Sequence, residues 1–309
     1  MRILIVGCGG VGGYFGGQLA RAGGDVMFLA RAQTASVLRR QGLELRWPDR
    51  SERISVGCVT VGDLHSAHKL PVFEYVWITV KCYDLAQALN DIAPIMRSGA
   101  PTIVTCQNGL GAEELILERY ADAPLIGGVA YVSAERIASG VIGAQPGGSA
   151  AFGAWNAPAA TMIGPWIAQW QQANLKVRQA LDIRAAKWEK LCWNAVFNAL
   201  TAGLRCPLGD VLRSPQLLEI GREAVREIQA LAAAQGLELN QATLDTYFRD
   251  TGTLSSQYTS MYVDLEAGRP TEVDWINGAI VQRGEQAGIP TPLNRSLRTL
   301  VKMQERLRR

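Results

Sequence analysis

RILIVGCGGVGGYFGGQLARAGGDVMFLAR, residues 2–31, decides the fold of this 309-residue chain. Its first five residues predict a buried strand, residues 14–23 predict a helix, and residues 25–31 predict a second strand. The turn at 7–12 has the pattern GxGxxG between a strand and a helix, which is the context of a dinucleotide-binding fingerprint. Such a turn lets backbone N–H groups approach a pyrophosphate at the positive end of the helix. The alternative is a glycine-rich turn that binds nothing. The candidate cofactor-binding residues are Gly7, Cys8, Gly9, Gly10, Val11 and Gly12.

The end of the second strand indicates which dinucleotide is expected. An NAD site places Asp or Glu there for the ribose 2′-hydroxyl, whereas a cation suits the 2′-phosphate of NADP. This chain has Ala30 and Arg31 at that point, and its next carboxylate is Glu44. We therefore expect NADP(H), held in part by Arg31. The alternative is that Arg31 is an ordinary exposed charge at a strand end.

Two more polar residues follow predicted strands. EYVWITVK at 74–81 ends at Lys81, and PTIVTCQNGLG at 101–111 runs into a turn at Asn108. Ligands of open α/β sheets lie at the carboxyl ends of the strands. Lys81 is therefore a candidate for the cofactor phosphates and Asn108 for the nicotinamide edge, although ordinary loop polarity explains either residue equally well.

The character of the chain changes near residues 181–183. Before that point predicted strands and helices alternate, with a hairpin-like region at 125–155 and a last strand at 175–181. After Asp182 the strand signals vanish and helical periodicity continues almost to the end. We therefore predict an α/β Rossmann-like domain at 1–182 and an all-α domain at 183–309.

The second predicted domain opens with an unusual helix, KWEKLCWNAVFNALTAG at 187–203. Residues four apart drift by only about 40° around a helix, so Lys190, Asn194 and Asn198 form a narrow polar strip on an otherwise apolar helix. A surface helix shows the opposite pattern. Because an unpaired buried charge is costly, this strip predicts a wet cleft or a ligand. The alternative is a core helix whose lysine reaches the surface.

Two later residues are weaker candidates for the same site. Ser260 lies on a helix predicted at about 254–266, and Glu272 lies in the first turn of a helix that begins near Pro270. Each has a simpler explanation. Ser260 can be an ordinary helical serine, and Glu272 can compensate the helix dipole.

Composition excludes several classes of protein. The net charge of +3 is too small to indicate a nucleic-acid partner, and no apolar run approaches the ~20 residues of a membrane span. The six cysteines are scattered without a CxxC pair, as expected for reduced thiols in a cytoplasmic protein. His65 and His68 form an HxxH pair that no further ligand completes, so we expect no metal. With only two histidines, proton chemistry would fall to Lys, Glu or Asp.

These motifs together resemble the ketopantoate reductases (2-dehydropantoate 2-reductases), over essentially the whole chain. The shared segments are GCGGVGGYFGGQLA, the strand-end Arg31, ITVK, QNGLG, KLCWNAVFN and RPTEVDWINGA. The resemblance implies a Rossmann domain followed by a helical domain of the 6-phosphogluconate dehydrogenase C-terminal type. It implies NADPH-dependent reduction of 2-dehydropantoate to (R)-pantoate, a step toward pantothenate and coenzyme A. It also implies a small-molecule 2-keto acid as substrate. We expect a cytoplasmic enzyme that binds neither nucleic acid nor a membrane and that can form a homodimer.

The resemblance also implies a role for each candidate residue, in an active site enclosed by the two domains. Lys190 corresponds to the general acid. The implied substrate-binding residues are Asn108, Asn194, Asn198, Ser260 and Glu272. The implied NADPH-binding residues are residues 7–12, Arg31, Lys81, Asn108 and Glu272.

One position departs from the family pattern. Some members carry a substrate-binding Asn directly after the Cys-Pro that follows the catalytic helix, whereas Leu208 follows Cys206 and Pro207 here. Reduction of a different 2-keto acid therefore stays open. So does a dinucleotide sensor without turnover, although a sensor has no reason to keep an ammonium on a buried polar strip.

Overall fold

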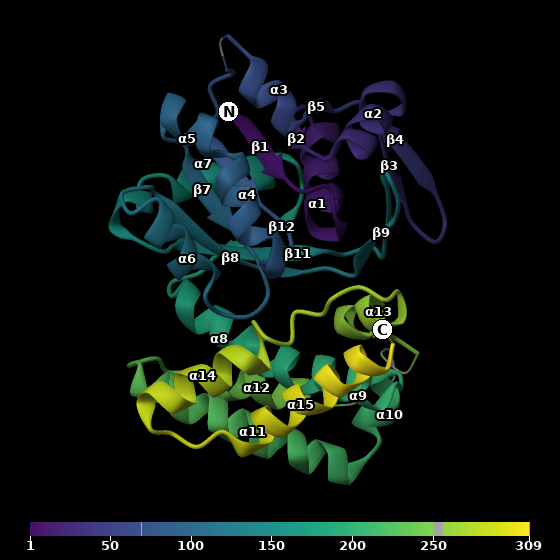
Figure 1. Ribbon diagram of the computed structural model, residues 1–309, viewed down its shortest axis with the longest axis vertical. Helices are drawn as coiled ribbons and strands as arrows, with labels where there is room; N and C mark the ends of the chain where they lie inside the picture. Colours follow the sequence, from purple (N-terminus) through teal and green to yellow (C-terminus); the bar gives the residue numbers. More distant parts are fainter. Residues whose placement is uncertain (69, 250–255, 309) are drawn as a thin grey trace. The chain divides into compact units, whose positions relative to one another are not determined.

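A computed structural model describes residues 1–68, 70–249 and 256–308, and the chain divides into two compact units (Figure 1). The first unit comprises residues 1–107 and 112–183, and the second comprises residues 108–111 and 184–309. The short segment 108–111 therefore belongs with the helices that follow residue 183. The assignment of the cofactor to residues 1–182 and of the substrate to residues 183–309 stays a prediction.

The first unit is built on an eight-stranded sheet with the strand order β12-β11-β8-β7-β6-β1-β2-β5. The six strands from β8 to β5 are parallel to their neighbours, β11 is antiparallel to β8, and β12 is parallel to β11. The strands are β1 (Arg2–Val6), β2 (Asp25–Leu29), β5 (Gly57–Val59), β6 (Tyr75–Ile78), β7 (Thr102–Thr105), β8 (Leu125–Tyr131), β11 (Ser149–Ala154) and β12 (Lys176–Gln179).

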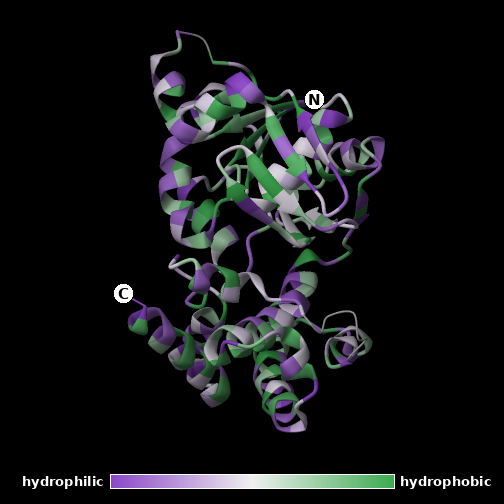
Figure 2. Ribbon diagram, turned by 90° about the vertical axis from the view of Figure 1, so that its right-hand side faces the viewer, coloured by the Kyte–Doolittle hydropathy of each residue, from purple (hydrophilic) through white to green (hydrophobic). Residues whose placement is uncertain are grey.

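Both faces of this sheet are covered, and its strands carry mostly hydrophobic residues (Figure 2). Alternate side chains enter opposite cores: Ile3 and Ile5 enter one, and Leu4 and Val6 enter the other. The first core packs under α1 (Gly10–Arg21) and α7 (Ile163–Gln172). The second packs under α3 (Val61–Ser66), α4 (Leu85–Asp91), α5 (Ala93–Gly99) and α6 (Ala112–Arg119). Burial on both faces explains why the strands read as continuous apolar runs.

A second sheet of four strands, in the order β4-β3-β10-β9, packs against the other side of α1. Gly13 and Gly17 of α1 leave room there for Ile142 and Leu43 of this small sheet. The strands are β3 (Leu43–Arg46), β4 (Ser51–Ile54), β9 (Ala134–Ala138) and β10 (Val141–Ala144). The hairpin-like region expected at 125–155 is thus shared between the two sheets.

Some predicted helices are interrupted. The amphipathic pattern of YDLAQALNDIAPIM at 83–96 predicts a single helix. The structure has η1 (Cys82–Asp84), α4 and α5 there, and the helix breaks at Ile92, two residues before Pro94. Proline has no backbone N–H to donate to the preceding turn, so it is tolerated only in the first turn of a helix, which is its position in α5. The remaining elements of the unit are α2 (Ala32–Gln41) and η2 (Ala157–Ala159).

Every regular element of the second unit among the described residues is a helix, and these helices enclose a core of their own. The helix expected at 254–266 begins only at Ser260, since residues 256–259 are described and are not helical, while positions 254 and 255 lie outside the described residues. Its elements are α8 (Ile183–Trp193), η3 (Asn194–Asn198), α9 (Ala199–Leu204), α10 (Leu208–Leu212), α11 (Pro215–Ala234), α12 (Gln241–Tyr247), α13 (Ser260–Glu266), α14 (Asn277–Ala287) and α15 (Pro292–Leu307).

Candidate active site

Three glycines shape the turn between β1 and α1. Gly7 has a positive φ of 104°, which a residue with a side chain adopts only with strain. A Cβ on Gly12 would run into Thr79 Oγ1 and Gly7 O, so only glycine lets the helix approach the strand this closely. At Gly9 a Cβ would meet nothing within 4 Å, so the backbone there lies open to a ligand. These are the three uses of glycine that pyrophosphate binding requires.

The surroundings of the turn suit an anion. Helix α1 begins at Gly10 with no side-chain hydrogen bond at its cap and no acidic residue in its first turn, so its positive end is not offset by a carboxylate of its own. Thr79 Oγ1, just after β6, donates to Gly7 O at 2.9 Å and fixes the turn. Burial raises the pKa of the Cys8 thiol to about 12, so Cys8 contributes a neutral side chain. The residues fit a dinucleotide phosphate.

Arg31 and Lys81 follow β2 and β6, the two strands that flank β1. Arg31 lies at the start of α2 with 85% of its side chain exposed, and its Nη2 is 3.4 Å from Asp84 Oδ2. Lys81 is partly buried at the start of η1. Both predicted cations therefore lie at the carboxyl edge of the sheet, on either side of the glycine turn.

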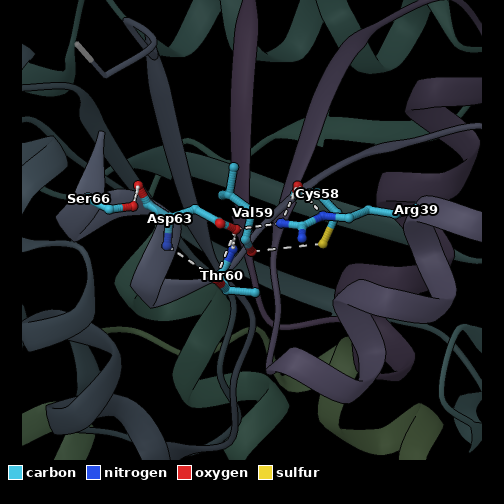
Figure 3. Close-up of polar contacts among 6 residues, drawn as sticks. All are labelled: Arg39, Cys58, Val59, Thr60, Asp63 and Ser66. Carbon is cyan, nitrogen blue, oxygen red and sulfur yellow. Dashed lines mark hydrogen bonds and ion pairs between the residues drawn. The ribbon is translucent and has the colours of Figure 1, made fainter. Parts of the chain in front are cut away.

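A second arginine near β2 has a different environment (Figure 3). Arg39 of α2 forms an ion pair with Asp63 and donates to Cys58 O at 3.4 Å. Asp63 also accepts hydrogen bonds from Thr60 N and Oγ1, which together lower the pKa of its carboxyl. These contacts anchor α2 to the end of β5. Arg39 is therefore a structural cation, while Arg31 faces solvent.

In the second unit, Lys190 lies on the last turn of α8 and is partly buried. Burial lowers the pKa of its ammonium from 10.5 to about 8, because desolvation disfavours the charged form. Such a value suits a proton donor near neutral pH.

Three carboxamides of the second unit form a hydrogen-bonded chain. Asn198 Nδ2 donates to Asn194 Oδ1 at 3.3 Å, and Asn194 Nδ2 donates to Asn108 Oδ1 at 3.2 Å. Asn194 and Asn198 are both buried. The structure thus brings together three of the residues expected to bind the substrate, and it orients their amides in one direction.

The helix that carries these residues is not a continuous α-helix. Residues 194–198 form the π-turn η3 between α8 and α9, whereas the sequence predicted one α-helix at 187–203. A π-turn inserts a wider turn into a helix and is often found at functional sites. The polar strip therefore has a different angular spacing from the one that an α-helical repeat predicts.

Asn108 is held in the second unit by the turn that it begins. Gly109 and Gly111 have positive φ values of 85° and 102°. Leu110 N donates to Trp275 O at 3.0 Å, and the Leu110 side chain lies in the core of the second unit. The predicted Asn-Gly turn is present, and its glycines provide the conformation that it needs.

Ser260 lies on a helix as predicted, although at its start, whereas Glu272 does not lie in the predicted helix. Ser260 is exposed at the first position of α13, directly after Thr259, whose hydroxyl lies 2.7 Å from Thr201 Oγ1. Glu272 is buried in a turn, because the helix predicted to begin near Pro270 begins at Asn277. Its carbonyl accepts from Trp275 N and Ile276 N, both at 3.0 Å.

Sequence reasoning gave no role to several residues that shape this site. Asp84 and Thr259 are revealed only by contacts with residues distant in the sequence. Asn277 belongs to the motif TEVDWING, so the signal was present, but its contact with the π-turn depends on the fold. Among the described residues, no cluster of three or more metal-ligating side chains is found, and no helix has the length and apolar character of a membrane span.

Comparison with known proteins agrees with this architecture. Residues 3–157 match the family described as ketopantoate reductase PanE/ApbA, and residues 182–305 match its C-terminal family. The 2-dehydropantoate 2-reductase of Streptococcus pyogenes serotype M3 (strain ATCC BAA-595 / MGAS315) is 30% identical over 99% of this chain and 98% of its own length.

Solved structures share the fold over the whole chain. The 2-dehydropantoate 2-reductase of Geobacter metallireducens GS-15 has a TM-score of 0.88 and 29% identity, covering 98% of this chain and 99% of its own. D-mandelate dehydrogenase in complex with NADH and anilino(oxo)acetate has a TM-score of 0.91 at 23% identity, and the match covers 100% of this chain and 99% of that protein. At that identity the second likeness concerns the fold alone. The chain therefore belongs to the ketopantoate reductase family, whose members are NADPH-dependent oxidoreductases.

Proposed function

We propose that this protein reduces 2-dehydropantoate (ketopantoate) to (R)-pantoate with NADPH, a step toward pantothenate and coenzyme A. The observation that carries the proposal is the hydrogen-bonded chain of Asn198, Asn194 and Asn108. It is joined by the ammonium of Lys190, four residues before Asn194, whose pKa is lowered by burial to about 8. Full-length relatives named 2-dehydropantoate 2-reductase support the choice of substrate.

In this proposal NADPH supplies the hydride that reaches the ketone carbon. Negative charge then grows on the ketone oxygen, and the Lys190 ammonium stabilises that charge and donates the proton. A pKa of about 8 leaves most of the lysine protonated at pH 7 while making its proton easier to give up than that of an ordinary lysine.

The other candidate residues bind and orient the two ligands. Asn194 and Asn198 hold the keto acid through their amides, and Ser260 takes its carboxylate. Asn108 and Glu272 contact both substrate and cofactor. The NADPH-binding residues are residues 7–12, Arg31 and Lys81, of which Arg31 is the cation for the 2′-phosphate, because the sequence places no carboxylate at the end of β2.

Leu208 favours a second candidate, the reduction of another 2-keto acid. Its side chain is only 3% exposed and belongs to the core of the second unit. An apolar side chain in that position provides no hydrogen bond to a substrate hydroxyl. A site with fewer polar contacts discriminates less strongly among substrates that differ in a hydroxyl.

A panel of 2-keto acids tests the proposal, with NADPH oxidation followed by absorbance. We expect ketopantoate to have the highest kcat/KM of the panel. An isosteric Leu208→Asn variant separates the two candidates. This buried polar side chain should lower stability in either case. If ketopantoate is already the substrate, no gain in selectivity for ketopantoate is expected, whereas such a gain supports the second candidate. A smaller keto acid turned over more efficiently by the wild type would contradict the ketopantoate assignment and support the second candidate.

A further inference from the structure

Asn277, the first residue of α14, makes a direct contact with the π-turn. Its side chain is fully buried, and its Nδ2 donates to Ala195 O at 3.0 Å and to Asn294 Oδ1 at 3.1 Å. Ala195 lies within η3, between the two asparagines expected to hold the substrate. The proposed function gives Asn277 no role of its own.

The orientation of the Asn277 amide is fixed by its neighbours. Asn294 Nδ2 donates to Glu227 Oε2 at 2.7 Å and to Ala224 O at 3.1 Å, so its Oδ1 is the atom turned toward Asn277. That acceptor requires the N–H side of the Asn277 amide. Nδ2 therefore also faces Ala195 O. Flipping the amide would place an oxygen against two oxygens.

The same orientation has a cost. Asn277 Oδ1 is buried and accepts no hydrogen bond from any described residue. A buried acceptor left in this state lowers stability, so the side chain is not an optimal choice for packing alone. The Asn277 side chain instead provides a hydrogen-bond donor to Ala195 O, in the π-turn where the backbone hydrogen bonds of the helix change from the α to the π pattern. A π-turn disturbs the pairing of backbone carbonyls, and these groups need partners when buried.

We propose that Asn277 is a positioning residue that holds the π-turn, and that it thereby sets the placement of Asn194 and Asn198 toward the keto acid. The part that concerns the keto acid rests on the proposed function. The part that concerns the π-turn does not. Asn277 itself acts through Ala195 O and through the asparagines on either side of it.

An Asn277→Asp variant is the sharpest test. It keeps the size of the side chain, removes both N–H donors and places a carboxylate oxygen against Ala195 O. We expect the KM for ketopantoate to rise by about tenfold or more, because small displacements of binding groups weaken oriented contacts, while the Kd for NADPH changes less than twofold. Hydrogen–deuterium exchange at the amides of residues 194–199 should become faster than in the wild type.

Asn156→Asp is the matched control. Asn156 Nδ2 donates to Ala123 O at 2.9 Å, so the substitution removes the same kind of bond in the first unit, away from any π-turn. We expect it to lower the melting temperature and to leave both the KM for ketopantoate and exchange at 194–199 unchanged. Asn277→Ser, which introduces no charge and is too short to reach Ala195 O, replaces the aspartate variant if that variant does not fold.

The outcomes separate the two proposals. A folded Asn277 variant with wild-type exchange at 194–199 overturns the positioning role, whatever its activity. Faster exchange there with an unchanged KM for a turned-over keto acid overturns the link to the substrate. If the wild type reduces no 2-keto acid, the proposed function fails, whereas the exchange measurement still decides whether Asn277 holds the turn.

Discussion

Among single residues, Lys190 is the group that should set the pH range of the reduction if it acts as the proposed proton donor. Its burial lowers the pKa of the ammonium to about 8, and only the protonated form donates a proton. We therefore expect kcat/KM for keto acid reduction to be level below about pH 8 and to fall tenfold per pH unit above it. Lys190→Ala should lower turnover by a factor on the order of 10²–10⁴. It should also abolish the break in the pH profile, which is the change from level to falling kcat/KM near pH 8. Initial rates between pH 6 and 10, measured at low substrate concentration, check both statements.

Lys190→Arg is the matched variant for this prediction. Arginine keeps the positive charge but stays protonated throughout the accessible pH range. It should therefore bind substrate better than Lys190→Ala, remain slow in turnover, and show no break near pH 8. An arginine variant with the wild-type pH profile would assign the break to a different group.

Among the elements, the turn that carries Glu272 is fixed by helix α15. Glu305 accepts from Thr271 N at 2.9 Å and from Thr271 Oγ1 at 2.7 Å, and it pairs with Lys302 at 2.6 Å. Lys302 also contacts Asp274 at 3.1 Å. Residues on both sides of Glu272 are thus tied to one helix. The sequence could not show this, because the partners are about thirty residues apart and the helix expected near Pro270 begins only at Asn277.

We predict that Glu305→Ala lowers the free energy of unfolding by about 1–3 kcal/mol, because it leaves buried donors without an acceptor, and that it raises the KM for the keto acid. Burial alone would raise the pKa of Glu305, but hydrogen bonds from Lys302 and Thr271 outweigh it and lower the pKa below 4.5. A carboxylate with a lowered pKa stabilises the fold above its unfolded value and loses this effect as pH falls through the folded value. The difference between wild type and variant should therefore shrink below about pH 4.5.

Chemical denaturation at pH 7 and pH 4 measures this difference. Glu285→Ala serves as the control, because it removes an exposed ion pair between α14 and α15 at 2.7 Å, for which about 0–1 kcal/mol is expected. Equal losses in the two variants would show that Glu305 is no more than a surface charge.

For the whole molecule, cofactor binding should appear as added thermal stability. A ligand that binds only the folded state stabilises it by about 2.7 kcal/mol at a hundredfold excess over Kd. Arg31 is exposed and paired with Asp84 at 3.4 Å, so a 2′-phosphate must compete with a carboxylate for it. We expect NADPH to raise the melting temperature more than NADH at equal concentration, Arg31→Ala to remove this difference, and Asp84→Asn to enlarge it. A larger shift with NADPH that survives in Arg31→Ala would place the 2′-phosphate elsewhere.

The sequence predicted those parts of the molecule that are determined locally. The glycine turn is one, since Gly7 needs its positive φ and Gly12 its missing Cβ whatever surrounds them. The family and the two-part architecture, α/β then all-α, follow from similar local patterns. The π-turn at 194–198 escaped prediction, because the same residue pattern fits an α-helix and a helix with a π-turn. The contact that we propose holds the turn comes from Asn277, about eighty residues away. The contact of Thr259, the residue before Ser260, with Thr201 likewise joins residues that are 58 apart in the sequence.

The four residues Asn108–Gly111 make the helical half of the protein discontinuous along the gene. A fragment containing only residues 184–309 would lack Leu110. Its hydrophobic core would then contain a cavity, and Trp275 O would lose the hydrogen bond from Leu110 N. This half therefore cannot be transplanted into a hybrid enzyme as one uninterrupted cassette. During synthesis on the ribosome, residues 108–111 also emerge long before the helices after residue 183 against which they pack.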